Sequence, residues 1–118
     1  MVEKITHDLT VAQQPRYLVC KACKQKITST ESRIAIKGQH LHLCVNPSGF
    51  RFEIGCFAWA EHCIHQGVPT LEYTWFQGYR WCLALCAGCY IHLGWFYQNG
   101  DHFYGFILAQ LEEQKPYL

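Results

Sequence analysis

Two pairs of cysteines carry the clearest chemistry in this sequence. Each pair has the spacing Cys-x-x-Cys, the first as Cys20 and Cys23 and the second as Cys86 and Cys89. A tight turn with this spacing presents two thiolates to one ion, and two such turns complete a tetrahedral four-sulfur site for Zn²⁺. A site closed by four protein ligands leaves no position open for a substrate, so we expect the zinc to be structural.

Other uses of these residue types stay open at this point. The cysteine pairs could form disulfides or a thioredoxin-like redox dithiol, although no strand-to-helix pattern of the kind that redox motifs follow is evident. Iron is a further possible ion. The other thiols are expected to stay free, and none has an evident base beside it; they are Cys44, Cys56, Cys63 and Cys82. With four thiolates available, we expect the histidines to be solvent-facing or hydrogen-bonded; they include His40, His42, His62, His65 and His92.

Three tryptophans lie close together in the sequence, around a glycine turn and the second cysteine pair. Pairing of strands over about 71–76 and 80–86 would place Trp75 opposite Trp81. Pairing of 80–86 with 90–97 would bring Trp95 to the same cluster, where Gly94 leaves room for a ligand or a close strand. Aromatic walls suit a small flat or cationic ligand. The alternative is that these rings fill the core.

Length and composition limit the function classes. A chain of 118 residues fits one domain, and 50% hydrophobic with 16% charged residues argues against disorder. A net charge of +1 with no basic block does not favour a nucleic-acid partner. The first nineteen residues contain no apolar run typical of a signal peptide, and no stretch approaches the ~20 apolar residues of a membrane span. We therefore expect a cytoplasmic protein without a membrane partner.

The hydrophobic pattern predicts an all-β fold. We expect a loose arm over 1–15, one domain over 16–111 and a tail over 112–118. The segment 57–66 is ambiguous between helix and strand. The predicted strands are 16–19, 32–37, 39–45, a strand beginning at Phe50, then 71–76, 80–86, 90–97 and 103–110.

A hairpin is predicted around Asn46-Pro47. In the strand before it, Leu41, Leu43 and Val45 alternate with polar residues, so one face of that strand is apolar. Asn-Pro-Ser-Gly then has proline and glycine at positions that suit a four-residue turn.

Three motifs together resemble one known family. They are Val45-Asn46-Pro47-x-Gly49, Glu72-x-x-Trp75-Phe76-x-Gly78-Tyr79-x-Trp81 and Cys86-x-x-Cys89-x-x-His92-x-Gly94-Trp95. The chain resembles the CULT-domain family, which is the thalidomide-binding domain of cereblon, and in particular its bacterial single-domain members. The similarity runs from about Cys20 to Leu111.

The resemblance implies a β-tent, in which two antiparallel sheets meet at roughly right angles with zinc near the join. It implies a cage walled by Trp75, Trp81 and Trp95, closed on another side by Tyr97. Asn46, Pro47 and Phe52 would border its mouth. The ligand's imide N–H would donate to the carbonyl of Tyr73, and an imide carbonyl would accept from the N–H of Trp75, with Thr74 between them.

The chain also departs from the family pattern. Vertebrate cereblon has His at the position of Tyr73, Ser at Thr74 and Phe at Tyr97. We find no Lon-like domain and no helical ligase-adaptor domain before the match, so a ubiquitin-ligase role is not expected.

These features favour a non-catalytic module that binds cyclic imides. Ligands implied by the resemblance are glutarimides such as thalidomide, uridine-like rings and cyclic imides at peptide C-termini. An enzyme similar to methionine sulfoxide reductase B, on a related zinc fold, is the first alternative. A cage for quaternary ammonium groups is the second, because tryptophan faces attract cations.

Overall fold

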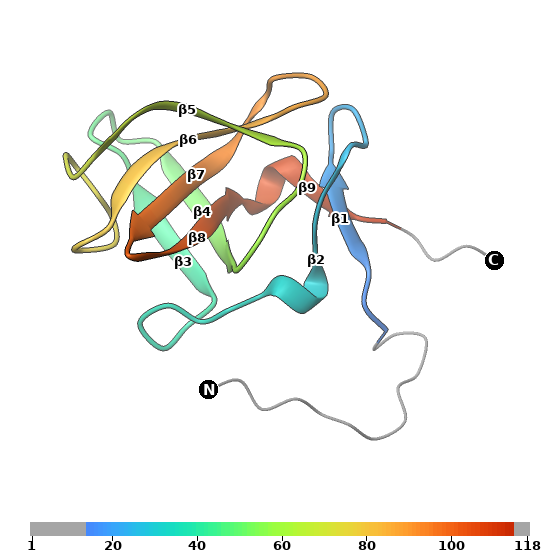
Figure 1. The fold of residues 1–118 in the computed structure, drawn as a ribbon, viewed down its shortest axis with the longest axis horizontal. Coiled ribbons are helices and arrows are strands. Elements are labelled where there is room, and N and C mark those ends of the chain that lie inside the picture. The colour runs from blue at the N-terminus through green and yellow to red at the C-terminus, as the bar shows by residue number, and fades with distance from the viewer. Residues whose placement is uncertain (1–13, 115–118) are drawn as a thin grey trace.

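The structure of the protein is a computed structural model that describes residues 14–114, and this part of the chain is built almost wholly of β-strands (Figure 1). Two short 3₁₀ turns, η2 (Thr30–Ser32) and η3 (Leu108–Gln110), are the other regular elements among these residues. The strands are β1 (Tyr17–Cys20), β2 (Lys26–Ser29), β3 (Leu41–Val45), β4 (Arg51–Phe57), β5 (Cys63–Thr70), β6 (Arg80–Cys86), β7 (His92–Asn99), β8 (Asp101–Ile107) and β9 (Leu111–Glu113).

The strands form two sheets. The smaller sheet has the order β2-β1-β9 and the larger has the order β3-β4-β8-β7-β6-β5, with every neighbouring pair antiparallel. The small sheet lies at one side of the large one, and the chain passes from β8 through η3 into β9 to join them (Figure 1). The prediction of an all-β fold with two antiparallel sheets is confirmed.

Two apolar clusters hold the sheets in place. The first packs Leu18, Ile27 and Leu111 of the small sheet against Phe57 and Phe106 of the large one. The second lies within the curve of the large sheet and contains the buried side chains Ile54, Phe76, Trp95, Tyr97 and Phe103. Because burial of apolar surface is the main stabilising term in folding, the first cluster fixes the small sheet on the large one. The second includes Trp95 and packs against Trp75 and Trp81.

Two predicted strands are wrong. In the segment 32–37, Ser32 ends the 3₁₀ turn η2, and the residues after it form a loop. The segment 71–76 is also a loop, because β5 runs through Gly67 and Pro69 to Thr70 and itself pairs with β6. Trp81 therefore pairs with Thr70 and not with Trp75. The ambiguous segment 57–66 supplies the end of β4 and the start of β5.

The apolar face of β3 points outward. Leu41, Leu43 and Val45 are 50%, 70% and 49% exposed, whereas Cys44 on the alternate face is buried. On that inner side the ring of His42 lies 4.9 Å from that of Phe76, and its Nε2 lies 3.1 Å from the Ile36 carbonyl oxygen. A loop carbonyl that pairs with the imidazole lowers the cost of placing this polar ring against the core.

The small sheet extends past the predicted domain boundary at 111. β9 runs to Glu113 and pairs with β1, and the N–H of Gln114 donates to the Tyr17 carbonyl. Most of the predicted arm over 1–15, and residues 115–118 of the predicted tail, lie outside the described residues. Among residues 14–114 there is no helix long and apolar enough to cross a membrane.

Candidate functional site

The four cysteines of the two Cys-x-x-Cys pairs converge. Their sulfur atoms all lie within 4.8 Å of one another, with 3.8 Å between Cys20 and Cys89 and 3.5 Å between Cys23 and Cys86. A tetrahedral ion with metal–sulfur bonds of about 2.3 Å separates its ligands by about 3.8 Å. The four thiols therefore fit a tetrahedral metal centre, and no histidine belongs to this group in the described part of the chain.

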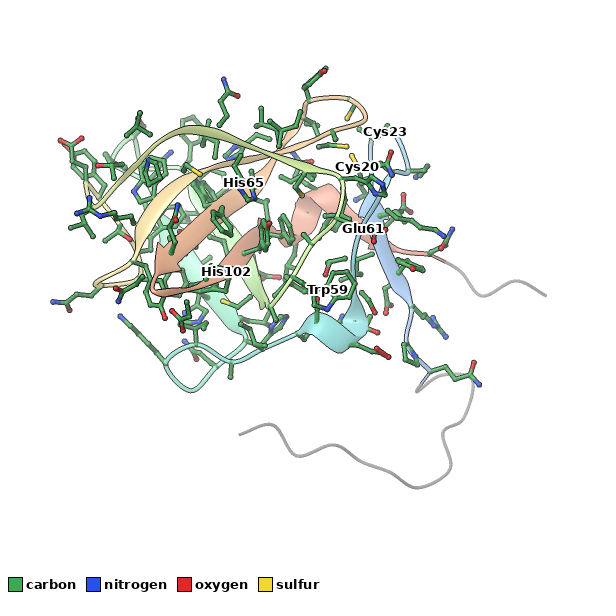
Figure 2. The ribbon with its side chains drawn as sticks, in the orientation of Figure 1. Cys20, Cys23, Trp59, Glu61, His65 and His102 are labelled. Carbon is green, nitrogen blue, oxygen red and sulfur yellow. The ribbon has the colours of Figure 1, made fainter. Side chains whose placement is uncertain are left out.

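The two ligand turns share one backbone design. In the first, the N–H of Lys24 donates to the Cys20 carbonyl, and in the second the N–H of Tyr90 donates to the Cys86 carbonyl. Lys24 and Tyr90 both have positive φ, at 69° and 64°. The first turn joins β1 to β2 in the small sheet, and the second joins β6 to β7 in the large sheet. A metal held by both turns would tie the two sheets together (Figure 2).

A cavity of about 340 Å³ opens on the inner side of the large sheet. Eight of the nine predicted ligand-binding residues line it, and the ninth, Thr74, does not. Sequence reasoning missed Leu83, which follows Trp81 at the period of two typical of a strand, and His92, which is part of the third motif. The lining is Asn46, Pro47, Phe52, Tyr73, Trp75, Trp81, Leu83, His92, Trp95 and Tyr97.

Two pairs of rings around the cavity meet edge to face. The Trp75 and Trp95 rings lie 4.8 Å apart at 77°, and Phe52 packs against Trp95 at 5.3 Å and 77°. Trp81 stands opposite Tyr97 in the β6–β7 register, with Leu83 opposite Trp95. In this arrangement the rings line an open space and do not stack on one another. The strands thus bring Trp81 and Trp95 together, whereas Trp75 arrives on the loop 71–79.

Hydrogen bonds fix two of the three indoles. The N–H of Trp75 donates to the Val45 carbonyl at 3.0 Å, and the N–H of Trp81 donates to the Glu72 carbonyl at 2.7 Å. Each indole therefore has its polar atom paired with the protein backbone. The ring surfaces that face the cavity are therefore apolar, and the two hydrogen bonds hold these rings in fixed orientations.

The loop 71–79 has an unusual backbone beside the cavity. Tyr73 has φ 55°, a conformation that side chains other than glycine seldom adopt. The hydroxyl of Thr74 donates to the Tyr79 carbonyl at 2.8 Å, which closes the loop on itself and explains why Thr74 does not line the cavity. Within the described residues, the carbonyl of Tyr73 and the backbone N–H of Trp75 have no hydrogen-bond partner in the protein.

Comparison with known proteins identifies the family. No family model matches the chain. It is 30% identical to cereblon of Gallus gallus over 100 residues, which cover 80% of this chain and 22% of that protein. It is 26% identical to cereblon of Xenopus tropicalis over 127 aligned residues, which cover 98% of this chain and 28% of that protein. The chain belongs to the cereblon CULT-domain family. It spans less than a third of the length of these relatives.

A structural neighbour agrees on the fold of this CULT domain. The "Yippee-like" domain of Mis18 superposes with a TM-score of 0.61 over 89% of this chain and all of that one. The two sequences are 13% identical, so the similarity concerns the fold alone.

The cavity of this CULT domain is electrically neutral. No aspartate, glutamate, lysine or arginine is among its lining residues. Burial lowers the pKa of His92, which is partly offset by a hydrogen bond from its Nε2–H to the Gly94 carbonyl at 2.9 Å. Burial also raises the pKa of the Tyr97 hydroxyl. Both groups are therefore uncharged near neutral pH, and the cavity suits a neutral ligand.

The four cysteines outside the candidate metal centre do not open onto the cavity. None is among its lining residues, and Cys82 is buried and paired with Phe96, one position along β6 from Trp81. Since successive strand residues point to opposite faces, the Cys82 thiol faces away from the cavity. Burial raises the pKa of Cys56 and of Cys63 to about 12, so neither thiol is ionised at neutral pH.

Proposed function

We propose that this domain is a non-catalytic module that binds small cyclic imides in its tryptophan-walled cavity. The observation that carries the proposal is the combination of an aromatic, neutral cavity with two unpartnered backbone groups on residues that line it. The Tyr73 carbonyl is an acceptor and the Trp75 N–H is a donor, and they stand two residues apart on one loop.

An imide has the complementary edge. Its N–H lies between two carbonyls, so the N–H can donate to the Tyr73 carbonyl while one carbonyl accepts from the Trp75 N–H. Burying a ring amide without these bonds would cost about 1–3 kcal/mol for each unpaired group. Because the backbone supplies both bonds, Tyr at position 73 can replace the His of vertebrate cereblon. Glutarimides, uridine-like rings and cyclic imides at peptide C-termini all present this edge.

We further propose that the metal centre holds Zn²⁺. Cys20, Cys23, Cys86 and Cys89 would be its ligands, and four thiolates at tetrahedral spacing suit this ion. The role would be structural, because a four-thiolate site has no open position. The cysteines would brace the β6–β7 hairpin that carries Trp81, Leu83 and Trp95.

Binding of glutarimide, followed by tryptophan fluorescence, tests the imide proposal. We expect saturable quenching. Trp81→Ala should weaken binding by about 2 kcal/mol or more, roughly 30-fold, because it removes a buried aromatic anchor.

The fourth tryptophan provides a matched control. Trp59 is 42% exposed and its carbonyl accepts from the Thr28 hydroxyl of β2, away from the cavity (Figure 2). Trp59→Phe should therefore remove background emission and leave the affinity unchanged. An unchanged emission spectrum and unchanged amide NMR shifts at saturating glutarimide would refute the proposal.

The alternatives have separate tests. A reductase of the methionine sulfoxide type needs a reactive cysteine beside its pocket, and no cysteine lines this one. Turnover of methionine sulfoxide with dithiothreitol, lost in Cys82→Ser, would favour that enzyme. A quaternary ammonium ligand would bind more weakly as salt rises, whereas a neutral imide should hardly respond.

A further inference from the structure

A second cavity lies where β6 begins and β7 ends, at the opposite end of this hairpin from the Cys86–Cys89 turn. Its lining is polar, unlike that of the tryptophan cage. Its volume is about 350 Å³, and its lining is Pro69, Gly78, Arg80, Gln98, Asn99 and Gly100. These residues come from the end of β5, the end of the loop 71–79, the start of β6, the end of β7 and the turn between β7 and β8. His102, at the start of β8, marks this end of the sheet in Figure 2 and stands opposite Gln98 in the β7–β8 register.

This cavity is separate from the tryptophan cage, and two of its side chains point to the other face of the sheet. Arg80 pairs with Gln98, and the next pair along the ladder is Trp81 with Tyr97. Neighbouring pairs point to opposite faces of a sheet, so the side chains of Arg80 and Gln98 face away from the aromatic cavity. The two cavities share no lining residue.

The polar side chains of this second cavity are unpartnered. Within residues 14–114, the guanidinium of Arg80 makes no ion pair or hydrogen bond, and the side-chain amides of Gln98 and Asn99 make no hydrogen bond. Asp101 is the nearby carboxylate along the chain, and its Oδ1 accepts from the Tyr79 hydroxyl at 3.0 Å. A cation and two side-chain amides thus belong to the lining of one concave surface, and that lining contains no acidic residue.

We propose that this second cavity binds a small oxyanion, a carboxylate or a phosphoryl group, through Arg80, Gln98 and Asn99. The planar guanidinium fork matches two oxygens of such a group, and charge-assisted bonds of this kind are stronger than neutral ones. The amides add N–H donors beside it. The absence of a side chain at Gly78 leaves space in this cavity. A Cβ there would lie 3.5 Å from the Asn99 Nδ2 and would fill part of that space.

Titration with inorganic phosphate, followed by amide NMR at pH 7.5, tests this proposal. Ionic strength is held constant with sodium chloride, and a parallel titration uses sodium acetate. We expect saturable shifts confined to the amides of Gly78, Arg80, Asn99 and Gly100. Whichever of phosphate and acetate binds more tightly identifies the phosphoryl or the carboxylate group as the better ligand.

Two variants separate a built site from general attraction of anions. Arg80→Gln should abolish the shifts or weaken binding at least tenfold, and because Arg80 is exposed it should leave the rest of the spectrum unchanged. Arg51→Gln, at an exposed arginine on β4, should bind as the parent does. Equal responses in Arg80→Gln and the parent, equal losses in both variants, or no saturable shift with either anion would overturn the proposal.

Discussion

Replacing Gly94 with alanine tests how closely β7 and β8 approach beneath the aromatic cavity. A Cβ at this position would lie 2.1 Å from the Gly105 carbonyl oxygen and 2.9 Å from the Phe106 Cα. Ordinary contact of a Cβ begins near 3.4 Å, so the first of these distances must grow by 3.4 − 2.1, about 1.3 Å. Both neighbours are backbone atoms of a central strand, and no side-chain rotation can relieve the overlap.

The cost should be large for one methyl group. Overpacking that side chains can absorb costs about 1–3 kcal/mol. Here two paired strands must separate, so we expect Gly94→Ala to lose about 3 kcal/mol or more of the free energy of unfolding. That is a large part of the ~5–15 kcal/mol typical of a small domain. Urea unfolding, followed by tryptophan fluorescence, measures it.

Gly38→Ala is the matched control. Gly38 has φ 84°, and nothing lies within 4 Å of the point where a Cβ would stand, so alanine there meets backbone strain without crowding. We expect a loss of about 1–2 kcal/mol from that strain. Gly94→Ala should in addition weaken glutarimide binding, because Trp95 is the next residue. A loss no greater than that of Gly38→Ala would refute the close approach of the two strands.

Three further results are expected. Cys86→Ser, or removal of the metal with a chelator, should lower the thermal midpoint in circular dichroism well below that of the non-ligand control Cys82→Ser. Burial, with His102 as a lesser cause, lowers the pKa of His65 from 6.5, and burial lowers that of His92. The unfolded chain therefore takes up protons first, and the free energy of unfolding should fall as pH drops below about 6.5; equal urea midpoints at pH 7.5 and 5.5 would contradict this. Leu43→Lys should change stability by no more than about 0.5 kcal/mol in the same assay, since this side chain is 70% exposed.

The local features of this chain were predictable from its sequence. Each Cys-x-x-Cys pair is one tight turn, so the spacing alone indicates two ligands that meet. The Asn46-Pro47 hairpin is equally local, because the Asn46 side chain accepts from the N–H groups of Ser48 and Phe50 within the turn itself. The strands β6, β7 and β8 were also predicted, over 80–86, 90–97 and 103–110.

The route by which Trp75 reaches the cavity could not be predicted in the same way. The segment 71–76 has the alternating residues of a strand, but Tyr73 has a positive φ that could not be predicted from its residue type. On the side of β6 away from β7, the neighbouring strand is β5 and not the segment 71–76. β5 continues past Gly67 and Pro69 with a shift of register between Gln66 and Thr70. The pairing of β5 with β6 depends on tertiary packing and not on local propensity.

Gly94 shows how one residue can be interpreted in two ways from sequence. Its missing side chain was consistent with room for a ligand or with a close strand. The distances to Gly105 and Phe106 favour the close strand, because a Cβ would meet β8 backbone. The empty space for a ligand is bordered instead by Trp95 and His92 on either side of this glycine in the sequence.

The metal site and the aromatic cavity are linked through one hairpin. Trp81 lies near the start of β6 and Cys86 ends it, while β7 begins at His92, just after Cys89, and carries Trp95. The same hairpin thus supplies two of the four candidate metal ligands and five of the cavity's lining residues, Trp81, Leu83, His92, Trp95 and Tyr97. The other two ligands lie in the small sheet and its first turn, which contribute nothing to the cavity lining. Loss of the ion should therefore loosen the cavity by freeing one end of this hairpin, even though no cysteine contacts the space where a ligand would bind.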